Sequence, residues 1–261
     1  MIPVALTIAG SDPSGGAGIQ ADLKTFHQFG VYGQAVITLV TVQNTVKVSR
    51  VDCLDPQLVQ EQIEAVLEDF PPGAVKTGAL GNSSIIEVVA RVWSTSAIPL
   101  VVDPVMISKH GASLIAAEAR EALVKLLLPC ATLVTPNLHE AAALAGFAVD
   151  SLDSMKQAAE RILSFGPKAV LVKGGHLAGN ATDVLFSGGE FLVLDAARSN
   201  TIHTHGTGCT YSAAVTALLA AGVKLEDAVR RAKLFITEAI RTNPGLGKGS
   251  GPVNHHATFK A

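Results

Sequence analysis

The sequence predicts an α/β fold with a mostly parallel sheet covered by helices on both faces. Short apolar runs, several rich in β-branched residues, alternate with helix-length segments along most of the chain. Such alternation specifies right-handed βαβ crossovers and strands that are buried on both faces. At 261 residues, 48% of them hydrophobic, the chain is long enough to bury a large core. No linker, repeat or shift in composition divides it, so we expect one domain over residues 1–261.

The expected strands and helices follow one another with little chain between them. Residues 4–9 form an apolar run typical of a buried parallel strand, and the glycine- and serine-rich stretch 10–16 ends it. A helix is expected from about 17 to 29, where Gly30 stops it. Later strands are expected at 34–42, 74–80, 98–103, 132–135 and 169–173, and later helices at 56–69, 83–94, 113–127, 138–145 and 153–165.

The last third of the chain departs from strict alternation. Two short apolar runs flank Gly188-Gly189, which predicts an antiparallel hairpin over 182–196 at one edge of the sheet. A helix of small apolar residues is expected after the sequence HGTGC, and an amphipathic helix at 225–241. The tail 244–256 is rich in glycine and is expected either to fray or to wrap over a ligand.

The composition excludes several classes of partner. A net charge of -2 gives no electrostatic reason to expect binding to nucleic acid or to an anionic membrane. Cys53, Cys130 and Cys209 lie far apart and without the spacing of a zinc site, so we expect no disulfide framework. The N-terminal apolar run is too short for a signal peptide or a membrane span. We therefore expect a cytoplasmic protein that acts on small molecules.

Polar side chains follow most of the expected strands. Ligands of open parallel sheets bind beyond the carboxyl ends of the strands, so these side chains are expected on one rim. Each one alone is typical of a cap or a turn, and Asn137 would simply cap the helix that contains Glu140. Together they favour a site for an anion, a cation and a small polar ligand. The set is Ser11, Asp12, Asp22, Gln43, Asn44, Asp103, Asn137, Glu140 and Lys173.

The stretch from Gly206 to Cys209 is the strongest indication of chemistry. Two glycines let the backbone turn tightly into a helix whose first amides lack intrahelical partners, which is typical of a phosphate site. Cys209 falls near the first turn, where the helix dipole is expected to lower the thiol pKa. The alternative is an ordinary glycine turn followed by a small buried cysteine.

Two other nucleotide-binding motifs are not met. Residues 16–21 satisfy G-x-G-x-x-G/A, but six residues separate the first glycine from the strand, and no acidic residue closes the second strand. No G-K-[ST] occurs there, which excludes a Walker A loop. A nicotinamide-dependent dehydrogenase is therefore disfavoured, and a non-catalytic nucleotide-binding regulator remains as a further alternative.

Eight segments run in order along nearly the whole chain: TIAGSDPSGGAGIQADLKTF, TVQNT, KTGALG, VVDPVM, TPNLHEA, VLVKGGH, HTHGTGCT and GSGPVNH. In these segments the chain resembles kinases of the ribokinase superfamily, most closely the hydroxymethylpyrimidine/phosphomethylpyrimidine kinases of thiamine biosynthesis. The resemblance implies a three-layer α/β/α ribokinase-like fold with a small antiparallel edge hairpin and no separate lid domain. It also implies ATP and Mg²⁺ as cofactors, with transfer of the γ-phosphoryl group to a hydroxymethyl group.

The resemblance implies an anion hole at Gly206, Thr207 and Gly208, which would hold the transferring phosphoryl group. Cys209 stands where related sugar kinases carry an aspartate base. Phosphoryl transfer chiefly requires positioning and charge neutralisation, so a thiolate would suffice as a modest base for a primary alcohol.

The same resemblance implies a metal and nucleotide site beside the anion hole. Asn137 and Glu140 match an N-x-x-E motif that organises Mg²⁺ and the phosphates through water. Asp103 and Lys173 resemble residues near the metal and the ATP phosphates, and Thr207 is expected to contact the nucleotide as well. The loop after Gly247 is expected to border the adenine.

For the pyrimidine pocket, the resemblance implies Gly10, Asp22 and Gln43, with Val105 on the apolar side. An aminopyrimidine edge alternates donors and acceptors, and the Gln43 amide offers both at once. Gln43 is therefore the residue that we expect to recognise the substrate.

Two departures from the family pattern affect the breadth of substrates. Ala79 stands where a bulkier residue such as methionine is common, and His203 stands where asparagine is common. A roomier pocket would admit pyridoxine or pyridoxal, so a vitamin B6 kinase is the main alternative activity.

Sugars are disfavoured because no segment is inserted for a lid. A protein without a lid would cover its site by forming a homodimer. Our first hypothesis is a kinase that makes the pyrimidine monophosphate and then the diphosphate.

Overall fold

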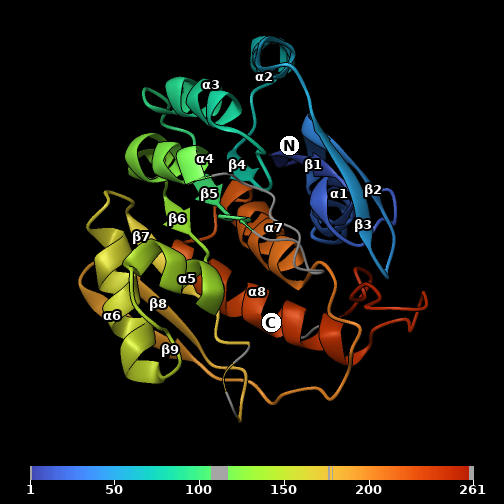
Figure 1. The fold of residues 1–261 in the computed structure, drawn as a ribbon, viewed down its shortest axis with the longest axis vertical. Helices are drawn as coiled ribbons and strands as arrows, with labels where there is room; N and C mark the ends of the chain where they lie inside the picture. The colour runs from blue at the N-terminus through green and yellow to red at the C-terminus, as the bar shows by residue number, and fades with distance from the viewer. Residues whose placement is uncertain (1, 107–116, 176, 178, 259–261) are drawn as a thin grey trace.

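The computed structural model describes residues 2–106, 117–175, 177 and 179–258. All strands of the described chain belong to one nine-stranded sheet (Figure 1). They are β1 Val4–Ser11, β2 Tyr32–Gln43, β3 Val48–Cys53, β4 Ala74–Thr77, β5 Leu100–Val102, β6 Leu133–Val134, β7 Ala169–Val172, β8 Asp183–Ser187 and β9 Glu190–Leu194. Their order in the sheet is β3-β2-β1-β4-β5-β6-β7-β8-β9. Within this order the six strands β2-β1-β4-β5-β6-β7 pair in parallel, which confirms the predicted fold class.

The helices lie in two layers, one on each face of the sheet. They are α1 Gly18–Gln28, α2 Pro56–Asp69, α3 Ser83–Trp93, α4 Ala117–Ala122, α5 Leu138–Ala145, α6 Leu152–Leu163, α7 Thr207–Ala220 and α8 Leu225–Arg241. A π-helical turn, Leu123–Leu127, and a 3₁₀ turn, Leu128–Cys130, continue α4. The expected helix 113–127 is therefore described only from residue 117, and its first residues lie outside the described part of the chain.

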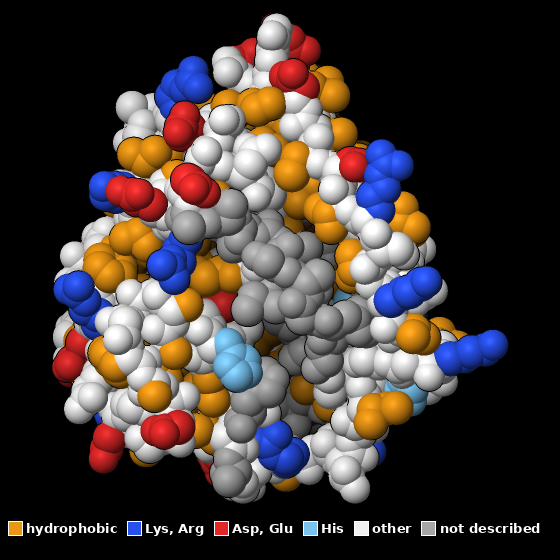
Figure 2. Space-filling model, viewed as in Figure 1, with side chains coloured by type: hydrophobic (Ala, Val, Ile, Leu, Met, Phe, Trp, Pro, Cys, Tyr) orange, Lys and Arg blue, Asp and Glu red, His pale blue; other side chains and the backbone are white. Residues whose placement is uncertain are grey.

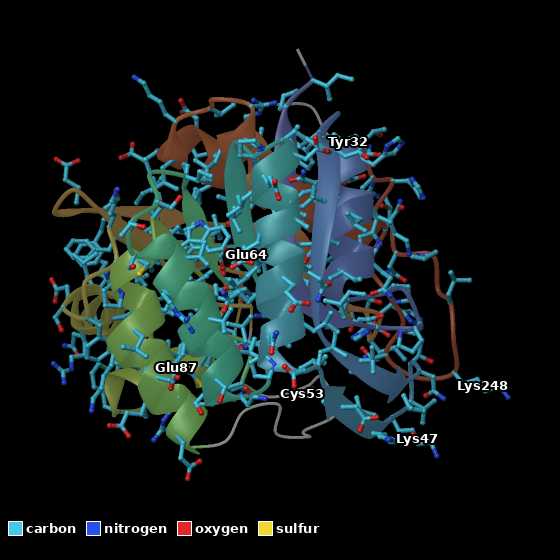
Figure 3. The ribbon with its side chains drawn as sticks, turned by 90° about the horizontal axis from the view of Figure 1, so that it is seen from above. Tyr32, Lys47, Cys53, Glu64, Glu87 and Lys248 are labelled. Atoms are coloured by element: carbon cyan, nitrogen blue, oxygen red, sulfur yellow. The ribbon has the colours of Figure 1, made fainter. Side chains whose placement is uncertain are left out.

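Alternation along the strands divides the core between the two layers. In β5, Leu100 and Val102 pack in a cluster with residues of α2, α3, α5 and α6, whereas Val101 packs with residues of α7 and α8. Helix α1 joins the second layer, because Phe26 packs against Ala213 and Ala217 of α7. The view from above shows α2 and α3 on one side of the sheet and the orange and red helices α7 and α8 on the other (Figure 3).

Both edges of the sheet are antiparallel. The expected hairpin over 182–196 is confirmed by β8 and β9. The other edge strand, β3, was not predicted, and it pairs antiparallel with the end of β2 from Leu39 to Gln43. Its sequence, VSRVDC, is half polar and exposed or half-buried throughout, so hydrophobic patterning alone gives little sign of it. Pairing with β2, rather than burial, makes this segment a strand.

The glycine-rich tail packs against the chain that precedes α7. The backbone amide of His205 donates to the Gly251 carbonyl at 3.0 Å, and the Val253 amide donates to the His205 carbonyl at 3.3 Å. The Gly249 amide donates to Thr45 Oγ1 at 3.3 Å, in the turn between β2 and β3. Figure 3 accordingly shows Lys248 and Lys47 at the same corner of the molecule. Of the two expected outcomes for the tail, fraying is therefore wrong.

The described surface carries mixed charge. On the face in Figure 2, the Lys and Arg side chains that can be seen are separate spots, several of them beside Asp or Glu. No helix in the described part of the chain is long and apolar enough to cross a membrane. Cys53, Cys130 and Cys209 are free thiols.

Candidate active site

The carboxyl ends of the central strands meet the N-terminus of α7. Asp103 directly follows β5, and Lys173 directly follows β7. The Lys173 amide donates to the Pro136 carbonyl at 2.8 Å, and Lys173 forms a parallel bridge with Asn137. Residues that the sequence placed on one rim are thus held side by side by backbone pairing at the ends of β6 and β7.

A buried ion pair lies against the first turn of α7. Lys173 Nζ lies 2.9 Å from Asp103 Oδ1, and both side chains are almost fully buried. A methyl group added at Gly208 would lie 3.2 Å from Lys173 Nζ and 3.6 Å from Asp103 Oδ2. Burial disfavours the charged amine, but the carboxylates of Asp103 and Glu140 raise the pKa of Lys173 above its ordinary value. A fixed positive charge therefore faces the start of α7.

Two hydroxyl groups that the sequence analysis missed lie against the Asp103 carboxylate. Thr135 Oγ1 donates to Oδ1 at 3.3 Å, whereas Ser212 Oγ lies 3.4 Å from Oδ2 and only 3.0 Å from the Gly208 carbonyl, the better acceptor for its one hydrogen. Thr135 is the last residue of the expected strand 132–135, so its position at a strand end was a usable signal. Ser212 lies one turn inside α7 and carries no such signal.

Asn137 and Glu140 form a capping box at the start of α5. The Glu140 amide donates to Asn137 Oδ1 at 3.0 Å, and the Asn137 amide donates to Glu140 Oε2 at 2.8 Å. The plain capping role weighed for Asn137 is therefore real. It leaves Glu140 buried, and burial together with the Asp103 charge raises its pKa to about 7, although Lys173 opposes the shift.

Helix α7 begins at a glycine that no other residue can replace without strain. Gly206 has φ of 77°, and a methyl group there would lie 1.7 Å from the Gly16 carbonyl oxygen. This close approach packs the loop before α1 against the start of α7. The amides of Gly208 and Cys209 fall in the first turn, where a helix offers no carbonyl partner, as an anion site requires.

Cys209 is half-buried at this turn. The sequence predicted a lowered thiol pKa, and this prediction is wrong for the protein without ligands. Burial raises the pKa of Cys209 to about 11, and the charges of Asp22 and Asp103 add to the effect. The Lys76 charge acts in the opposite direction. Dehydration and neighbouring carboxylates outweigh the factors that favour a thiolate.

Asp22 lies beneath this turn in a fully buried cluster. Its Oδ2 accepts from Thr7 Oγ1 at 2.6 Å and lies 2.9 Å from Lys76 Nζ. Although burial disfavours the charged amine, Asp22 raises the pKa of Lys76. Lys76 belongs to the KTGALG segment, but sequence analysis gave it no role because it lies inside an apolar strand.

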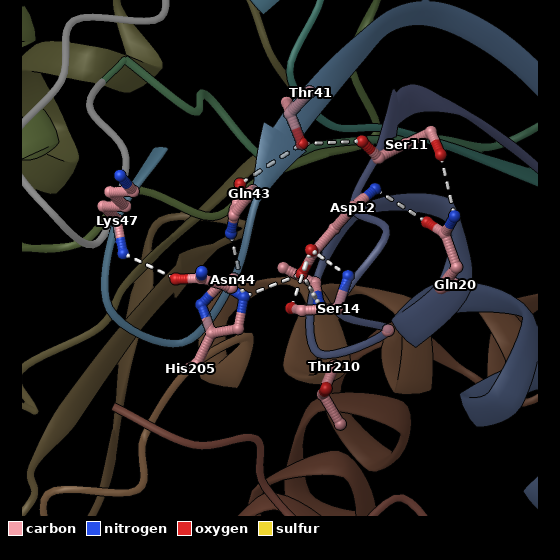
Figure 4. Close-up of polar contacts among 12 residues, drawn as sticks. Ser11, Asp12, Ser14, Gln20, Thr41, Gln43, Asn44, Lys47, His205 and Thr210 are labelled. Atoms are coloured by element: carbon pink, nitrogen blue, oxygen red, sulfur yellow. Dashed lines mark hydrogen bonds and ion pairs between the residues drawn. The ribbon is translucent and has the colours of Figure 1, made fainter. Parts of the chain in front are cut away.

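Gln43 ends β2 on the side of the loop that follows β1. One end of its amide lies 3.1 Å from Nε2 of His205, the residue directly before Gly206 (Figure 4). His205 Nε2 also lies 2.7 Å from Asp12 Oδ2. Asp12 was predicted on the rim, whereas His205 was missed because it precedes the helix rather than a strand end.

The remaining pocket residues lie near the ends of β1 and β5. Gly10 is buried in β1, and a methyl group there would lie 2.5 Å from Leu39 Cδ1. Val105 is half-buried and lines a narrow recess with Gly78 and Asp103. A larger hollow of about 530 Å³ lies between α4 and α5 and is lined by none of the predicted site residues.

The donor set suits a hard cation shared with a phosphate ligand. The described residues contain no group of three or more His, Cys, Asp and Glu side chains that could hold a metal ion. Asp103 and Glu140 supply two carboxylates, and the raised pKa of Glu140 reflects a buried negative charge that its neighbours only partly compensate. Mg²⁺ takes oxygen ligands and is commonly held by one or two carboxylates together with phosphates and waters. The residues present therefore fit Mg²⁺.

Comparison with known proteins agrees with this geometry. The family model described as phosphomethylpyrimidine kinase matches residues 12–254. The chain is 47% identical over 256 residues to the hydroxymethylpyrimidine/phosphomethylpyrimidine kinase of Bacillus subtilis, covering 97% of this chain and 94% of the relative. It is also 47% identical over 253 residues to the enzyme of that name from Streptomyces coelicolor, with the same coverage.

Solved structures place the fold among vitamin kinases. A phosphomethylpyrimidine kinase from Clostridium difficile has a TM-score of 0.81 and 47% identity, covering 91% of this chain and 99% of that one. An ADP complex of Bacillus subtilis pyridoxal kinase has a TM-score of 0.91 and 39% identity, covering 98% of each chain. The fold is thus the expected ribokinase-like one, and the chain is a kinase that belongs to the phosphomethylpyrimidine kinase family.

Proposed function

We propose that the protein transfers the γ-phosphoryl group of ATP to the hydroxymethyl group of 4-amino-5-hydroxymethyl-2-methylpyrimidine, and then phosphorylates the monophosphate. The observation that carries this proposal is the convergence of the Lys173–Asp103 pair on the first turn of α7, beside Gly208. A buried cation and open helix amides at one point provide what a transferring phosphoryl group requires, which is positioning and charge neutralisation. Family membership supplies the pyrimidine as acceptor.

Each side chain has a proposed part in this reaction. The amides of Gly208 and Cys209 bind the transferring phosphoryl group, and Lys173 balances its charge. Asp103 and Glu140 hold Mg²⁺ through water, and the ion neutralises the phosphates when bound. Cys209 Sγ accepts the proton of the hydroxymethyl group. Gly10, Gln43 and Val105 line the pyrimidine. Asp22 is fully buried, and it supports the floor of this pocket through its ion pair with Lys76. Thr207 and the loop after Gly247 border the nucleotide.

Cys209 has a physical obstacle to overcome as a base. With a pKa of about 11, its thiol is protonated at neutral pH in the protein without ligands. A loose transition state needs little help from a base, because the alcohol loses its proton late in the transfer.

The test is release of ADP with Mg²⁺-ATP and three parallel acceptors: the hydroxymethylpyrimidine, its monophosphate, and pyridoxal. We expect turnover of both pyrimidines, and none when Mg²⁺ or the acceptor is left out. Turnover without an acceptor contradicts the proposal. ATP binding without any turnover would support a non-catalytic nucleotide-binding regulator. Tight NAD binding would instead support a nicotinamide-dependent dehydrogenase.

A vitamin B6 kinase is the second candidate, and the solved structures favour it specifically. The neighbour named pyridoxal kinase covers more of this chain and has the higher TM-score, 0.91 against 0.81 for the phosphomethylpyrimidine kinase. Ala79 is half-buried between Gly78 and Leu80, which line the recess of Val105, and its small side chain is the feature of this segment that favours a larger ring. Turnover of pyridoxal alone would assign the protein to this activity.

We further propose a cytoplasmic homodimer. The three free thiols suit a reducing compartment. Val40, Val42 and Val46 expose 41%, 57% and 55% of their surface on the β2–β3 hairpin. Val40 and Val42 alternate with Thr41 and Gln43, so they point to the face opposite the site. An apolar face of this kind favours contact with a second copy of the chain.

A further inference from the structure

Asp12 is held as a buried carboxylate that only accepts hydrogen bonds. Its Oδ1 accepts from the Ser14 amide at 2.9 Å and from Ser14 Oγ at 2.7 Å, and its Oδ2 accepts from the Ala17 amide at 2.9 Å (Figure 4). Burial alone would raise the pKa of Asp12, but the hydrogen bonds from His205 and Ser14 lower it overall. The carboxyl group is therefore ionised and has no proton to donate.

This carboxylate determines where His205 carries a proton. His205 Nε2 lies 2.7 Å from Asp12 Oδ2, and two acceptors do not approach so closely. The Nε2 atom must therefore bear a hydrogen, whether the ring is neutral or charged. The ring cannot turn aside, because it lies against Gly16 and its backbone is bonded to Gly251 and Val253.

The protonated Nε2 in turn determines which end of the Gln43 amide faces it. Figure 4 draws the amide nitrogen 3.1 Å from His205 Nε2, which would bring two N–H donors together. Amide oxygen and nitrogen are nearly isosteric, so the hydrogen bonds decide between them. The oxygen of Gln43 must therefore face His205, where it takes the weaker, 3.1 Å branch of a hydrogen bond whose Nε2–H points mainly at Asp12.

Thr41 leads independently to the same orientation. Its hydroxyl donates to the Ser11 carbonyl at 3.0 Å and lies 3.4 Å from the other end of the Gln43 amide. A hydroxyl has one hydrogen, so after bonding to Ser11 it only accepts from Gln43. The amide end beside Thr41 must therefore be the NH₂ group. Exchanging the oxygen and nitrogen of the Gln43 amide therefore satisfies its contacts with both His205 and Thr41.

We propose that Asp12 and His205 are positioning residues that lock the Gln43 amide in one orientation and so set which hydrogen-bonding edge of the substrate ring is accepted. The proposal rests on the proposed function, because it assumes that Gln43 meets the pyrimidine. The lock leaves one N–H and one oxygen lone pair of Gln43 uncommitted, in a fixed order. His205 directly precedes Gly206, so the lock also ties the ring-binding side to the phosphate-binding turn.

A locked amide discriminates where a free amide does not. The 4-aminopyrimidine edge places a ring nitrogen that accepts beside an amino group that donates. Replacing the 4-amino group by an oxo group reverses this order, since the ring nitrogen then carries a hydrogen and the oxygen accepts. A free glutamine adapts by rotating its amide by half a turn, whereas a locked one leaves two mismatched pairs.

The kinetic test compares kcat/KM for the hydroxymethylpyrimidine with that for its 4-oxo analogue. In His205→Phe, which keeps the ring but has no N–H, we expect the ratio to fall about tenfold to hundredfold, as the loss of one buried mismatch predicts. His205→Gln keeps an N–H where Nε2 lies and should retain the ratio of the wild type. Ser14→Ala removes a different bond to Asp12 and is the matched control. An unchanged ratio in His205→Phe overturns the proposal, whatever its overall activity.

A second measurement does not depend on substrate and is read from the wild-type protein, with a variant used only to assign the signal. In wild-type protein labelled with ¹⁵N-histidine, the Nε2 resonance of His205, identified by its loss in His205→Gln, should show an attached hydrogen. An unprotonated Nε2 overturns the lock. If the wild type phosphorylates neither pyrimidine, the proposed function fails, and the protonation of Nε2 still decides whether the lock exists.

Discussion

At the scale of single residues, Cys209 shows two opposing effects on one thiol. Lys76 and a hydrogen bond from the Gly18 backbone favour the thiolate, whereas burial and two carboxylates favour the thiol, and the second group prevails. In the proposed function phosphates and Mg²⁺ bind at the same turn, which would change the net charge around the thiol. The role of Cys209 is therefore best measured under turnover.

We expect Cys209→Ser to lower kcat by about 10²- to 10⁴-fold while ATP affinity stays nearly unchanged. For the wild type, kcat/KM should rise with pH from neutral, because the thiolate fraction grows until the pH reaches the thiol pKa of about 11. The serine variant should lose this rise. Cys130→Ser is the control, since Cys130 bonds to the Leu126 carbonyl away from the site. A near-normal kcat in Cys209→Ser would mean that the helix amides, and not proton transfer to Cys209, provide most of the rate enhancement.

A substitution of Glu140 can remove the negative charge and still keep the hydrogen bond that caps α5. In Glu140→Gln the side-chain oxygen still accepts from the Asn137 amide, as Glu140 Oε2 does at 2.8 Å, so α5 keeps its start. Only the carboxylate that is proposed to organise the metal is lost. We expect the Mg²⁺ concentration for half-maximal rate to rise about tenfold to hundredfold. A change in melting temperature without any change in Mg²⁺ dependence would mean that Glu140 acts only as a cap.

At the scale of elements, α7 has a glycine with positive φ at each end. Gly206, at the start, has φ of 77° and lies against the Gly16 carbonyl, whereas Gly222, after the end, has φ of 80° with open space around it. Gly222→Ala should therefore lower the free energy of unfolding by only about 1–2 kcal/mol, from backbone strain. Gly206→Ala adds a backbone clash and should destabilise more.

Activity separates the two variants further. Gly206→Ala must move the first turn of α7 away from the loop before α1, so we expect kcat/KM to fall at least about tenfold. Gly222→Ala should retain activity near that of the wild type. Urea unfolding and initial rates measure both effects. Equal effects of the two substitutions would show that the contact with Gly16 does not position the turn.

The C-terminal tail is joined to α7 by a buried histidine. His255 Nε2 lies 3.1 Å from Thr210 Oγ1, and burial, together with the charge of Lys24, lowers its pKa to about 4. The unfolded chain binds this proton near pH 6.5, so the contribution of His255 to stability is complete above pH 6.5. It is lost as the pH falls from there towards 4.

Lowering the pH from 7.5 to 5 should thus destabilise the wild type by about 2 kcal/mol more than His255→Gln, which has no group to protonate. Urea unfolding at the two pH values measures this difference. His27→Gln, at an exposed position of α1, is the control and should behave as the wild type. If His255→Gln lost as much free energy of unfolding between pH 7.5 and 5 as the wild type, a group other than His255 would cause the acid sensitivity.

At the scale of the whole molecule, we propose that residues 1–261 form one domain, since every strand of the described chain belongs to one sheet. Its two edges differ in what they expose. The β2–β3 edge carries Val42, which is 57% exposed, and the β9 edge carries Val193, which is 41% exposed. The proposed homodimer uses the first of these edges.

Light scattering should give twice the chain mass of 26.9 kDa for the wild type. Val42→Lys should shift the protein towards the monomer, because a charge placed in an apolar contact loses hydration without gaining a partner. Val193→Lys makes the same change at the other edge and should stay dimeric. A monomeric wild type, or a dimer insensitive to Val42→Lys, would contradict the proposed edge.

The sequence by itself determined the fold class, the edge hairpin 182–196 and the rim of polar residues after the strands. These are local properties, since buried parallel strands must be apolar along their length and their carboxyl ends must share one rim. The capping box of Asn137 and Glu140 is equally local, because both partners lie within one turn. Residue order over nearly the whole chain then carried the family resemblance that the comparisons confirmed.

Only the tertiary structure decided how the side chains of the site affect one another. Strand β3 exists through pairing with β2 rather than through its own pattern. The raised pKa of Cys209 depends on Asp22, Lys76 and Asp103, which are distant in sequence. Asp12 and His205, 193 positions apart, meet because α7 starts against the loop after β1. Burial and charge act through space, so a sequence pattern that identifies the residues does not determine their protonation.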